Sequence, residues 1–391
     1  MTTSTALNEM LLEIRAIHGA GDIPLHRPVF VGNERRYLSE CIDSNFVSSV
    51  GARVTEFEQR IVEFTGCKYA VATVNGTAAL HVSLLLAGVK AKDEVLSQAV
   101  TFVATCNALA YIGAAPVFID VDLDTMSMSP KALSDWLETN AIRRGNEVFN
   151  KISGKRISAC VPMHTFGNPG RIKQIATVCQ AWGIPLIEDA AESLGSWVGE
   201  THTGNFGLMG TLSFNGNKVI TTGGGGMIMT NDSEIALRAK HLTTTAKRPH
   251  AYEFFHDEVG YNYRLPNLNA ALGCAQMEML PAMLQVKKQV AKRYELVCKQ
   301  HGIHFVSAVE GSTSNHWLNA IVLDDLAQRD EFLRRSNEQK IMTRPLWRLM
   351  SSLPAFVNCH NDGLSNSRWL EERVINIPSS VPDDTARSLK L

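Results

Sequence analysis

The sequence predicts an α/β fold: a large domain with a mainly parallel central sheet, followed by a smaller α+β domain. Two observations support this fold class. Through residues 28–257, β-branched runs alternate with helix-like segments, which is typical of a parallel sheet covered by helices on both faces. After about residue 257, a long helical stretch precedes short strand-like pieces. We therefore expect an N-terminal helical arm over residues 1–27, a large domain over 28–257 and a small domain over 258–391.

The composition is that of a globular protein with balanced charge. Apolar residues make up 45% and charged residues 20% of the 391 residues, and the formal net charge is −1. This balance argues against binding to nucleic acid or to an anionic membrane, and no apolar run reaches the ~18 residues of a membrane-spanning helix. The eight cysteines are scattered, without a CxxC pair or zinc-ligand spacing. We expect a cytoplasmic protein without a metal site.

The N-terminal arm is predicted to form a short helix that docks on the rest of the protein. Its apolar stretch contains two acidic residues and is not preceded by a positively charged region, so it is not typical of a signal peptide. The apolar residues recur at helical spacing and form one stripe: Leu7, Met10, Leu11, Ile14 and Ile17.

The large domain is predicted to contain seven strands and the helices between them. The strand-like runs are 69–74, 94–98, 116–120, 157–164, 185–189, 211–215 and 226–230. The helix-like segments are 78–88, 105–113, 129–140, 171–183 and 233–242. Their ends carry the expected signals, since Pro130 lies near one helix start, Ser233 is placed to cap another, and glycines close several helices.

The small domain is predicted to begin with a loop that leads into a long helix. This helix continues past Pro281 to about Gln300. Short strand-like pieces follow at 316–323, 340–347 and 374–380. The mixture of one long helix and short strands predicts an α+β unit.

Polar residues directly after the predicted strands are the candidate site residues, because α/β sheets bind ligands at the C-terminal ends of their strands. The stretch 75–78, Asn-Gly-Thr-Ala, starts a helix whose free N–H groups suit a phosphate, although a simple capping turn explains it as well. Asp189 ends a buried strand and needs a partner, which is a ligand cation, a metal or a helix cap. Glu192 lies one helical turn later, and a structural salt bridge explains both acids equally well.

Lys218 lies in the loop that follows the strand ending near Ser213. A lysine between glycines is usually a solvated surface cation, but Gly223–Gly226 would let backbone pass very close to a ligand. A lysine shielded from water has the lowered pKa that Schiff-base chemistry requires. An amine nucleophile, an acidic partner for a ring nitrogen and phosphate donors together match the needs of pyridoxal phosphate.

The chain resembles the fold-type I, pyridoxal phosphate-dependent sugar aminotransferases of the DegT/DnrJ/EryC1/StrS family over residues 28–380, nearly its whole length. It is most similar to the LegC-type subgroup, which makes 4-amino-4,6-dideoxy-N-acetylhexosamine nucleotides. The matching stretches are VSSVGARVTEFEQ, NGTAALHVSLLLAG, TFVATCNALAYIGAAPVFIDVD, VPMHTFGNP, IEDAAESLG, SFNGNKVITTGGGG and GYNYRLPNLNAALG.

The resemblance implies a role for each matching position. Lys218 corresponds to the lysine that binds the cofactor covalently, and Asp189 to the acid that keeps the pyridinium nitrogen protonated. Asn262 corresponds to an asparagine that reaches the cofactor phosphate of the neighbouring subunit, which implies a homodimer with shared active sites. The further cofactor contacts implied are the phosphate donors Gly76, Thr77, Ala78 and Ser213, the stacking ring of Phe102, and Glu192 near the ring substituents.

Two positions depart from the family pattern, and a third distinguishes the aminotransferases of the family from its dehydratases. Glu192 stands where glutamine or histidine is common, and Gly224 stands where many members carry glutamate. Family dehydratases carry histidine at the position of Lys218, so the lysine favours amino transfer over deoxygenation.

The resemblance implies transfer of an amino group from L-glutamate to the C4 keto carbon of a nucleotide-linked 4-keto-6-deoxy-N-acetylhexosamine, with UDP as the expected carrier, in the synthesis of bacterial surface sugars. The alternatives are a sugar-nucleotide dehydratase, a 3-keto sugar aminotransferase and a non-catalytic sugar-nucleotide-binding regulator. The candidate substrate contacts are His164, Arg344 and Trp347, with His81 and Arg264 as further candidates. A structural role explains each of these five residues equally well.

Overall fold

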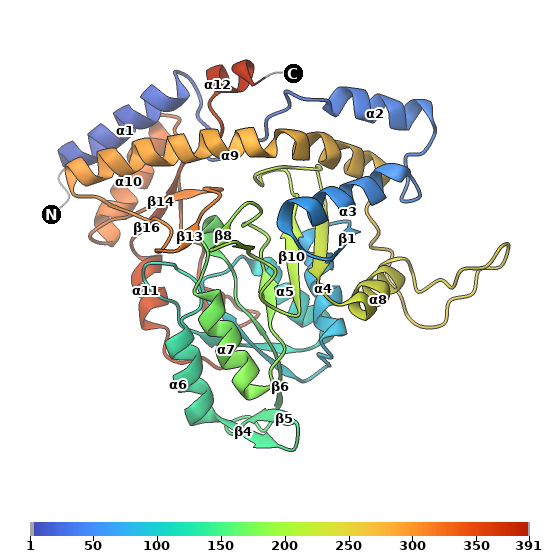
Figure 1. Cartoon of the computed structure of the whole chain (residues 1–391). Helices are drawn as coiled ribbons and strands as arrows, with labels where there is room; N and C mark the ends of the chain where they lie inside the picture. Colours follow the sequence, from blue (N-terminus) through green and yellow to red (C-terminus); the bar gives the residue numbers. More distant parts are fainter. Residues whose placement is uncertain (1–3, 390–391) are drawn as a thin grey trace.

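The computed structural model describes residues 4–389 (Figure 1). Seven strands form its central sheet. The strand order is β1-β11-β10-β7-β6-β2-β3, in which parallel bridges from Cys160 to Leu186 and from Met163 to Asp189 join β6 to β7. Of these seven strands, β11 alone runs in the direction opposite to the other six. The mainly parallel sheet expected from the sequence is therefore present. The strands are β1 (Tyr69–Thr73), β2 (Glu94–Gln98), β3 (Ala115–Ile119), β6 (Arg156–Val161), β7 (Ile187–Asp189), β10 (Met209–Ser213) and β11 (Gly226–Thr230).

Helices bury both faces of this sheet. Consecutive residues of β11 show the alternation, because Ile228 belongs to a cluster with α4 and α8 whereas Met227 belongs to a cluster with α3 and α9. A third apolar cluster joins α6 and α7 to β3 and β6. The helices around the large sheet are α2 (Glu34–Asp43), α3 (Ala52–Thr65), α4 (Gly76–Leu86), α5 (Val103–Ile112), α6 (Pro130–Asn140), α7 (Ile172–Trp182) and α8 (Ser233–Thr243).

Most helix ends follow the signals in the sequence, and one differs. Ser129 caps α6 directly before Pro130, as expected. The prediction that Ser233 caps α8 is wrong, because Asp232 is the capping residue and its side chain accepts from the N–H groups of Glu234 and Ile235. A carboxylate that serves two free N–H groups and faces the positive helix end takes this role, and the serine becomes the first helical residue.

Several short strands in polar stretches were not predicted. A hairpin of β4 (Ala141–Arg144) and β5 (Glu147–Asn150) extends the sheet beside the start of β6. A separate small sheet contains β8 (Trp197–Val198), β9 (Thr201–His202) and β13 (Ser312–Thr313). These strands are too short and too polar to show a hydrophobic period.

The C-terminal part contains the long predicted helix and an antiparallel sheet. Helix α9 (Asn267–His301) continues through Pro281, as expected, and crosses the top of the view in Figure 1. Strands β14 and β16 lie within the predicted runs 316–323 and 374–380, and β15 within 340–347. The sheet order is β12-β14-β16-β15, with β12 (His304–Phe305), β14 (Asn319–Val322), β15 (Arg344–Pro345) and β16 (Val374–Ile377), and the helices are α10 (Leu326–Glu338), α11 (Ser365–Glu371) and α12 (Asp383–Ser388).

The N-terminal arm docks as the sequence predicts. Helix α1 (Ser4–His18) lies along the C-terminal half of α9 (Figure 1), and every residue of its predicted apolar stripe is buried. This stripe shares one cluster with Tyr294 of α9 and Phe332 of α10, whereas the first half of α9 joins the cluster of α2 and α3. Helix α9 therefore belongs to both cores, and the three-part division of the chain stays a prediction.

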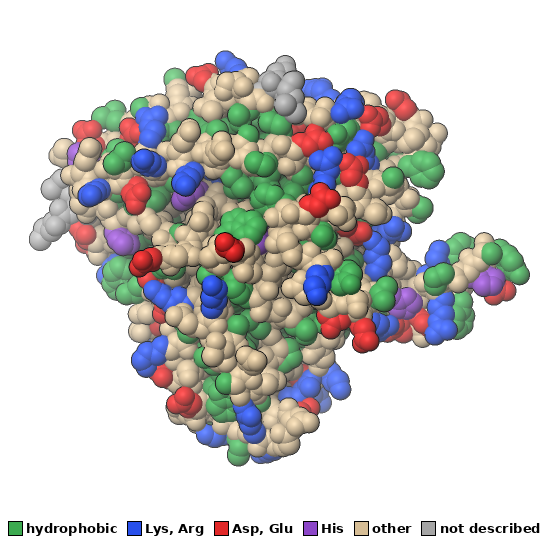
Figure 2. Space-filling model, viewed as in Figure 1, with side chains coloured by type: hydrophobic (Ala, Val, Ile, Leu, Met, Phe, Trp, Pro, Cys, Tyr) green, Lys and Arg blue, Asp and Glu red, His purple; other side chains and the backbone are tan. Residues whose placement is uncertain are grey.

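One segment after α8 projects far from the body of the protein (Figure 1). It carries apolar side chains along its length (Figure 2), and its exposed members are Tyr252, Phe254, Phe255 and Val259. Such a run of exposed apolar side chains is unusual for a surface that faces only water. Among the described residues, none of the helices has the length and apolar character needed to cross a bilayer.

Candidate active site

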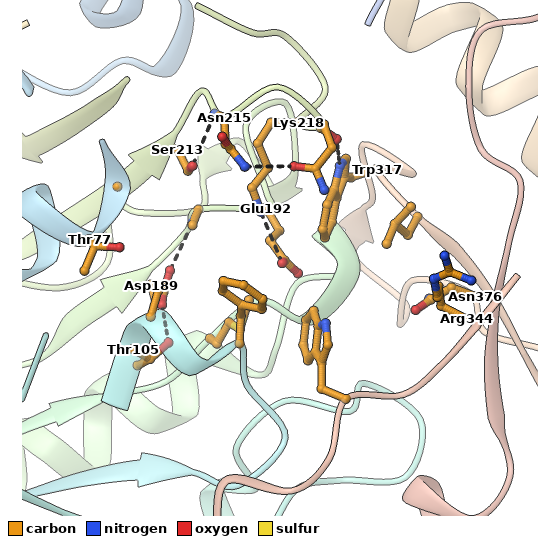
Figure 3. Close-up of a pocket in the computed structure, with 18 of the residues that line it drawn as sticks. Thr77, Thr105, Asp189, Glu192, Ser213, Asn215, Lys218, Trp317, Arg344 and Asn376 are labelled. Atoms are coloured by element: carbon orange, nitrogen blue, oxygen red, sulfur yellow. Dashed lines mark hydrogen bonds and ion pairs between the residues drawn. The ribbon is translucent and has the colours of Figure 1, made fainter. Parts of the chain in front are cut away.

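A cavity of about 660 Å³ lies between the C-terminal ends of the central strands and the C-terminal part of the chain. Figure 3 shows Thr77 and Asp189 at one end and Arg344 and Asn376 at the other, with Lys218 between them. The sequence-predicted residues that line the cavity are Gly76, Thr77, Phe102, Asp189, Glu192, Ser213, Lys218, Arg344 and Trp347. Residues more than a hundred positions apart in the sequence therefore meet at one site.

Asp189 is a buried carboxylate without a cationic partner among residues 4–389. It ends β7, its residue is 5% exposed, and its Oδ2 accepts from the Thr105 hydroxyl at 2.7 Å. The Ala191 N–H donates to Oδ1 at 3.2 Å. Burial raises the pKa of Asp189, and its hydrogen bonds and Lys218 only partly oppose this. A ligand cation in the cavity would complete the site.

Glu188 precedes Asp189 and has a structural role. Strand alternation directs the two side chains to opposite faces of the sheet. The Glu188 carboxylate accepts from the backbone N–H groups of Gly204, Phe206 and Gly207, and its Oε2 lies 3.1 Å from Nε2 of His164. This fully bonded acid anchors the loop before β10.

Lys218 extends from the loop after β10 into the middle of the cavity. Its Nζ lies 3.3 Å from Oε1 of Glu192 and 4.0 Å from the ring centroid of Trp317 (Figure 3). Trp317 donates from Nε1 to the carbonyl oxygen of Asn217 at 2.6 Å, next to Lys218 in the chain. The lysine is therefore shielded, with 13% of its side chain exposed, and is not the solvated surface cation that its loop alone would predict.

Glu192 is the second acid of the cavity. Its side chain is 1% exposed, and Oε2 accepts from the Phe166 N–H at 2.9 Å. Burial raises the pKa of Glu192 to about 7, and the nearby Lys218 ammonium acts in the opposite direction. Since its other oxygen pairs with Lys218, Glu192 has a cationic partner, whereas Asp189 has none in the part of the chain that the structure describes.

The start of α4 forms a seat for an anion. The N–H groups of Gly76 and Thr77 have no intrahelical acceptor, and both residues line the cavity beside Ser213. Ala78 differs from the expectation, because its N–H donates to Oδ1 of Asn75 at 2.7 Å and the residue does not line the cavity. The capping turn and the anion seat are thus both present, with Ala78 in the cap.

Two of the four glycines after Lys218, Gly225 and Gly226, are required by close packing. A Cβ at Gly226 would lie 2.4 Å from the carbonyl carbon of Asn75, and a Cβ at Gly225 would lie 2.2 Å from Oγ1 of Thr222. At Gly224 the nearest atom would be 3.8 Å away. Gly224 also lines the cavity, so the space that a glutamate side chain would occupy in many family members is open here.

Aromatic side chains form one wall of the cavity. Phe102 is 49% exposed, and its ring centroid lies 6.1 Å from that of Trp347. Trp347 also packs on the buried Phe166, with 4.9 Å between ring centroids. Phe102 therefore presents an open ring face toward a planar ligand.

Three of the proposed substrate contacts lie away from this cavity. His164 is 1% exposed, with Glu188 at Nε2 and the Gly170 N–H donating to Nδ1, so its expected contact with substrate is corrected to a structural role. His81 packs against Tyr261 and Tyr263. The backbone of Arg264 pairs with that of Thr73, and its side chain is absent from the cavity lining.

Asn262 is exposed and does not line the cavity of its own chain. Its backbone forms an antiparallel bridge with Thr244 at the base of the projecting segment. A role toward a neighbouring subunit, as the family resemblance implies, therefore stays a prediction.

Sequence reasoning missed several residues of the cavity. Thr105 and Trp317 contact the predicted acid and the predicted lysine, yet each lies in an apolar stretch that reads as core. The arginines Arg329 and Arg348 also line the cavity near Arg344. No local pattern distinguishes these residues, because their positions follow from the packing of the C-terminal part on the sheet.

The sequence of residues 30–386 matches the model of the DegT/DnrJ/EryC1/StrS aminotransferase family. The chain belongs to this family. It is 38% identical over 362 residues to the putative pyridoxal phosphate-dependent aminotransferase EpsN of Bacillus subtilis, covering 91% of this chain and 90% of the relative. It is 34% identical over 379 residues to GDP-perosamine synthase of Vibrio cholerae, with 94% and 97% covered. The solved structure of the aminotransferase TlmJ from Streptoalloteichus hindustanus matches with a TM-score of 0.84 at 27% identity, covering 94% and 97% of the two chains.

Family membership confirms the enzyme class, the cofactor and the fold expected from the motifs. The protein is a pyridoxal phosphate-dependent aminotransferase with the family's α/β architecture. The residues of the cavity fit this cofactor on three independent grounds. The buried carboxylate of Asp189 suits the cationic ring nitrogen, and the free N–H groups at the start of α4 suit the phosphate. The amine of Lys218 lies in the same cavity. The seat is tight, since a Cβ at Gly76 would lie 2.9 Å from that of Ser213.

Proposed function

We propose that this aminotransferase moves an amino group from L-glutamate to the C4 keto carbon of a nucleotide-linked 4-keto-6-deoxy-N-acetylhexosamine, with UDP as carrier, in the synthesis of bacterial surface sugars. The observation that supports it most is the convergence of Lys218, Asp189 and the open start of α4 in one cavity. A relative named for GDP-perosamine, an amino sugar nucleotide, supports a sugar nucleotide as the acceptor.

Lys218 has two tasks in this proposal. Its Nζ would bind the cofactor covalently. Once free, the same amine would take the proton from the Cα of the amino donor in the first half of the reaction, and in the second half it would deliver a proton to the sugar C4. Bound pyridoxal phosphate carries the amino group between the two substrates and stabilises negative charge on the carbon that loses a proton. Because Lys218 lies in the middle of the cavity, it reaches both tasks from one position.

Asp189 holds the proton on the cofactor's ring nitrogen. A pyridinium cation at its carboxylate would compensate the burial that raises the pKa of Asp189, and would restore the ionised form. The bonds from Thr105 and Ala191 fix both carboxylate oxygens and so orient the carboxylate toward the ring. Phe102 packs against the face of the ring.

The two ends of the cavity suit two anions. Gly76, Thr77 and Ser213 bind the cofactor phosphate at the start of α4. At the opposite end, Arg344 and Trp347 would contact the nucleotide part of the substrate. Arg329 and Arg348 also line the cavity, each beside an acidic partner. This end lies on the C-terminal part of the chain, so both parts of the protein bind the substrate.

The protein acts as a homodimer with shared active sites in this proposal. The projecting segment after α8 supports it, because the exposed Tyr252, Phe254, Phe255 and Val259 would be covered by a second copy. Asn262 lies at the base of this segment and would reach the cofactor phosphate of the partner.

A panel of sugar nucleotides tests the proposed function. The purified protein is incubated with L-glutamate and with 4-keto and 3-keto sugars carried on UDP, GDP or dTDP, and the products are identified by mass and NMR. The proposal expects 2-oxoglutarate and a 4-amino sugar from the UDP-linked 4-keto-6-deoxy-N-acetyl substrate. A 3-amino product, a deoxygenated product or a preference for GDP would each overturn the assignment of the acceptor.

A further inference from the structure

The amine of Lys218 has two partners that both favour its charged form. The carboxylate of Glu192 lies 3.3 Å from Nζ, and the ring centroid of Trp317 lies 4.0 Å from it on the C-terminal side of the cavity. A carboxylate attracts an ammonium through its charge, and an indole face attracts a cation through its quadrupole. Both partners therefore bind the ammonium form of Lys218 more strongly than its neutral amine form.

Hydrogen bonds fix both partners relative to each other. Glu192 is held at Oε2 by the Phe166 N–H, and its carbonyl oxygen accepts from Nδ2 of Asn315 at 2.8 Å. Oδ1 of the same Asn315 accepts from the Trp317 N–H at 2.8 Å. The side chain of Asn315 therefore connects the backbone of Glu192 to the backbone of Trp317.

Two further titratable groups face Lys218. Asp189 lies in the same cavity, but its oxygens accept from Thr105 and Ala191, and the proposed function gives its charge to the cofactor. Burial lowers the pKa of His26, which lies beside Asn217, so this ring is neutral and adds no charge. Glu192 is thus the carboxylate that is left for the lysine.

We propose that Glu192 and Trp317 form a holding site for the ammonium of Lys218, which the lysine occupies whenever it is protonated and not bonded to the cofactor. The inference rests on the proposed role of Lys218. Both residues are positioning residues in this scheme, because they act through the lysine. They hold the form that Lys218 takes after it has accepted the proton from the donor Cα.

The lysine leaves this site by giving up one proton. Transfer from Nζ to Oε1 of Glu192 turns the ammonium and the carboxylate into a neutral amine and a neutral carboxyl group, and the free amine can then attack a carbonyl carbon. Burial raises the pKa of Glu192 to about 7, so the carboxylate accepts a proton more readily than an exposed glutamate. The site therefore both protects the ammonium and provides the route for its deprotonation.

The reactivity of the Lys218 amine toward an acylating reagent tests the holding site directly. The holoenzyme is first converted with L-glutamate to the form in which the cofactor carries the amino group and the lysine is free. Lys218 is then acetylated competitively across a pH series, and the labelled peptide is quantified by mass spectrometry. Glu192→Gln is expected to increase the acetylation of Lys218 near neutral pH by ~10-fold or more, because only the neutral amine reacts and the opposite charge that favours the ammonium is removed.

Matched variants separate the holding site from a general loss of structure. Gln keeps the volume of Glu192 and an acceptor oxygen for the Phe166 N–H, so the loop keeps its anchor. Trp317→Leu is expected to increase the acetylation of Lys218 by a smaller factor than Glu192→Gln, and Trp317→Phe, which keeps a ring face, is expected to stay close to wild type. Glu200→Gln, at an exposed acid, should leave the acetylation of Lys218 unchanged.

Two results would be read differently. Unchanged or weaker acetylation of Lys218 in Glu192→Gln overturns the holding site, even if the enzyme is active. Borohydride trapping of the cofactor on a different lysine would instead overturn the proposed role of Lys218 itself. If Glu192→Gln does not retain the cofactor, the same labelling on cofactor-free wild-type and variant protein gives the decisive comparison.

Discussion

Trp317 donates a hydrogen bond from Nε1 to the carbonyl oxygen of Asn217, 2.6 Å away, and so joins the C-terminal part of the chain to the loop that carries Lys218. The same indole packs on the lysine amine. The position of Lys218 thus depends on both parts of the protein, because the loop after β10 is held from the side opposite to the sheet.

Replacing Lys218 by alanine should abolish covalent cofactor binding and amino transfer. Loss of a general base costs ~10²–10⁴-fold in rate, and the covalent anchor is lost as well. The visible absorbance of the purified protein and single-turnover production of 2-oxoglutarate measure the two effects. Lys131→Ala, at an exposed lysine on α6 that pairs with Asp135, is the control and should behave as wild type. Normal turnover by Lys218→Ala would exclude the assignment.

Asp189→Asn should separate stability from activity. The buried carboxylate has no cationic partner within the described residues, and burial raises its pKa. Its ionised form therefore lowers the free energy of unfolding of the cofactor-free protein at neutral pH. We expect the asparagine variant without cofactor to melt at a higher temperature than wild type. Its amino transfer should fall by ~10²-fold or more, because the charge that stabilises the reacting system is lost.

Thermal melts of cofactor-free protein and steady-state rates check the two parts of this prediction. Thr105→Val is a useful comparison, since it removes one hydrogen bond to Asp189 and keeps the charge. A fall in melting temperature together with full activity in Asp189→Asn would contradict both parts.

Two glycines in the same run should respond differently to alanine. In Gly226→Ala the new Cβ would lie 2.4 Å from backbone atoms of Asn75, which forces the start of α4 to move. We expect a loss of ~1–3 kcal/mol in the free energy of unfolding and weaker cofactor binding. Gly224→Ala, with 3.8 Å of clearance, should change the free energy of unfolding by less than ~0.5 kcal/mol. Equal effects of the two substitutions, in urea unfolding and cofactor titration, would refute the steric argument.

Lys287 predicts a pH dependence of stability. It is 2% exposed, its Nζ donates to the carbonyl oxygens of Trp317 and Ser379, and burial lowers its pKa from 10.5 to about 7. Since the folded-state pKa lies below the unfolded value, the folded protein loses this proton first as the pH rises. The free energy of unfolding should therefore increase between pH 7 and 10.5, with a contribution of up to ~1.4 kcal/mol per pH unit.

Urea unfolding across this pH range measures the contribution of Lys287. Lys287→Met should lack the upward slope, whereas Lys288→Met, at the exposed neighbouring residue, should keep it. The same slope in all three proteins would show that Lys287 is not the group responsible.

The sequence predicted the seven central strands, the long α9 and the docking helix α1, because apolar residues repeat at a local period in each. It did not predict the polar hairpin of β4 and β5, and it chose Ser233 over Asp232 as the cap of α8. Both misses concern segments whose conformation is set by polar hydrogen bonds, for which the hydrophobic pattern carries no information.

The candidate site divides in the same way. Asp189, Lys218 and Ser213 were found because they follow strands whose C-terminal ends must meet at one edge of a parallel sheet. His164 also follows a strand, yet its ring contacts Glu188 inside the fold, a contact that depends on which neighbouring strand it faces. The sequence did not explain why glycine stands at position 224, where many family members carry glutamate. The open space around Gly224 shows that the backbone tolerates other residues there.

The sequence by itself determined the order of strands and helices, the docking of the arm and the residues that carry the reactive groups, since these follow from local periodicity and from positions at strand ends. Only the tertiary structure decided that Glu192 pairs with Lys218, that Trp317 covers the amine and that Asp189 has no cation among the described residues. These relationships join residues that lie 26 to 100 positions apart in the sequence. Their energies depend on burial and distance, which arise only when the C-terminal part packs against the sheet.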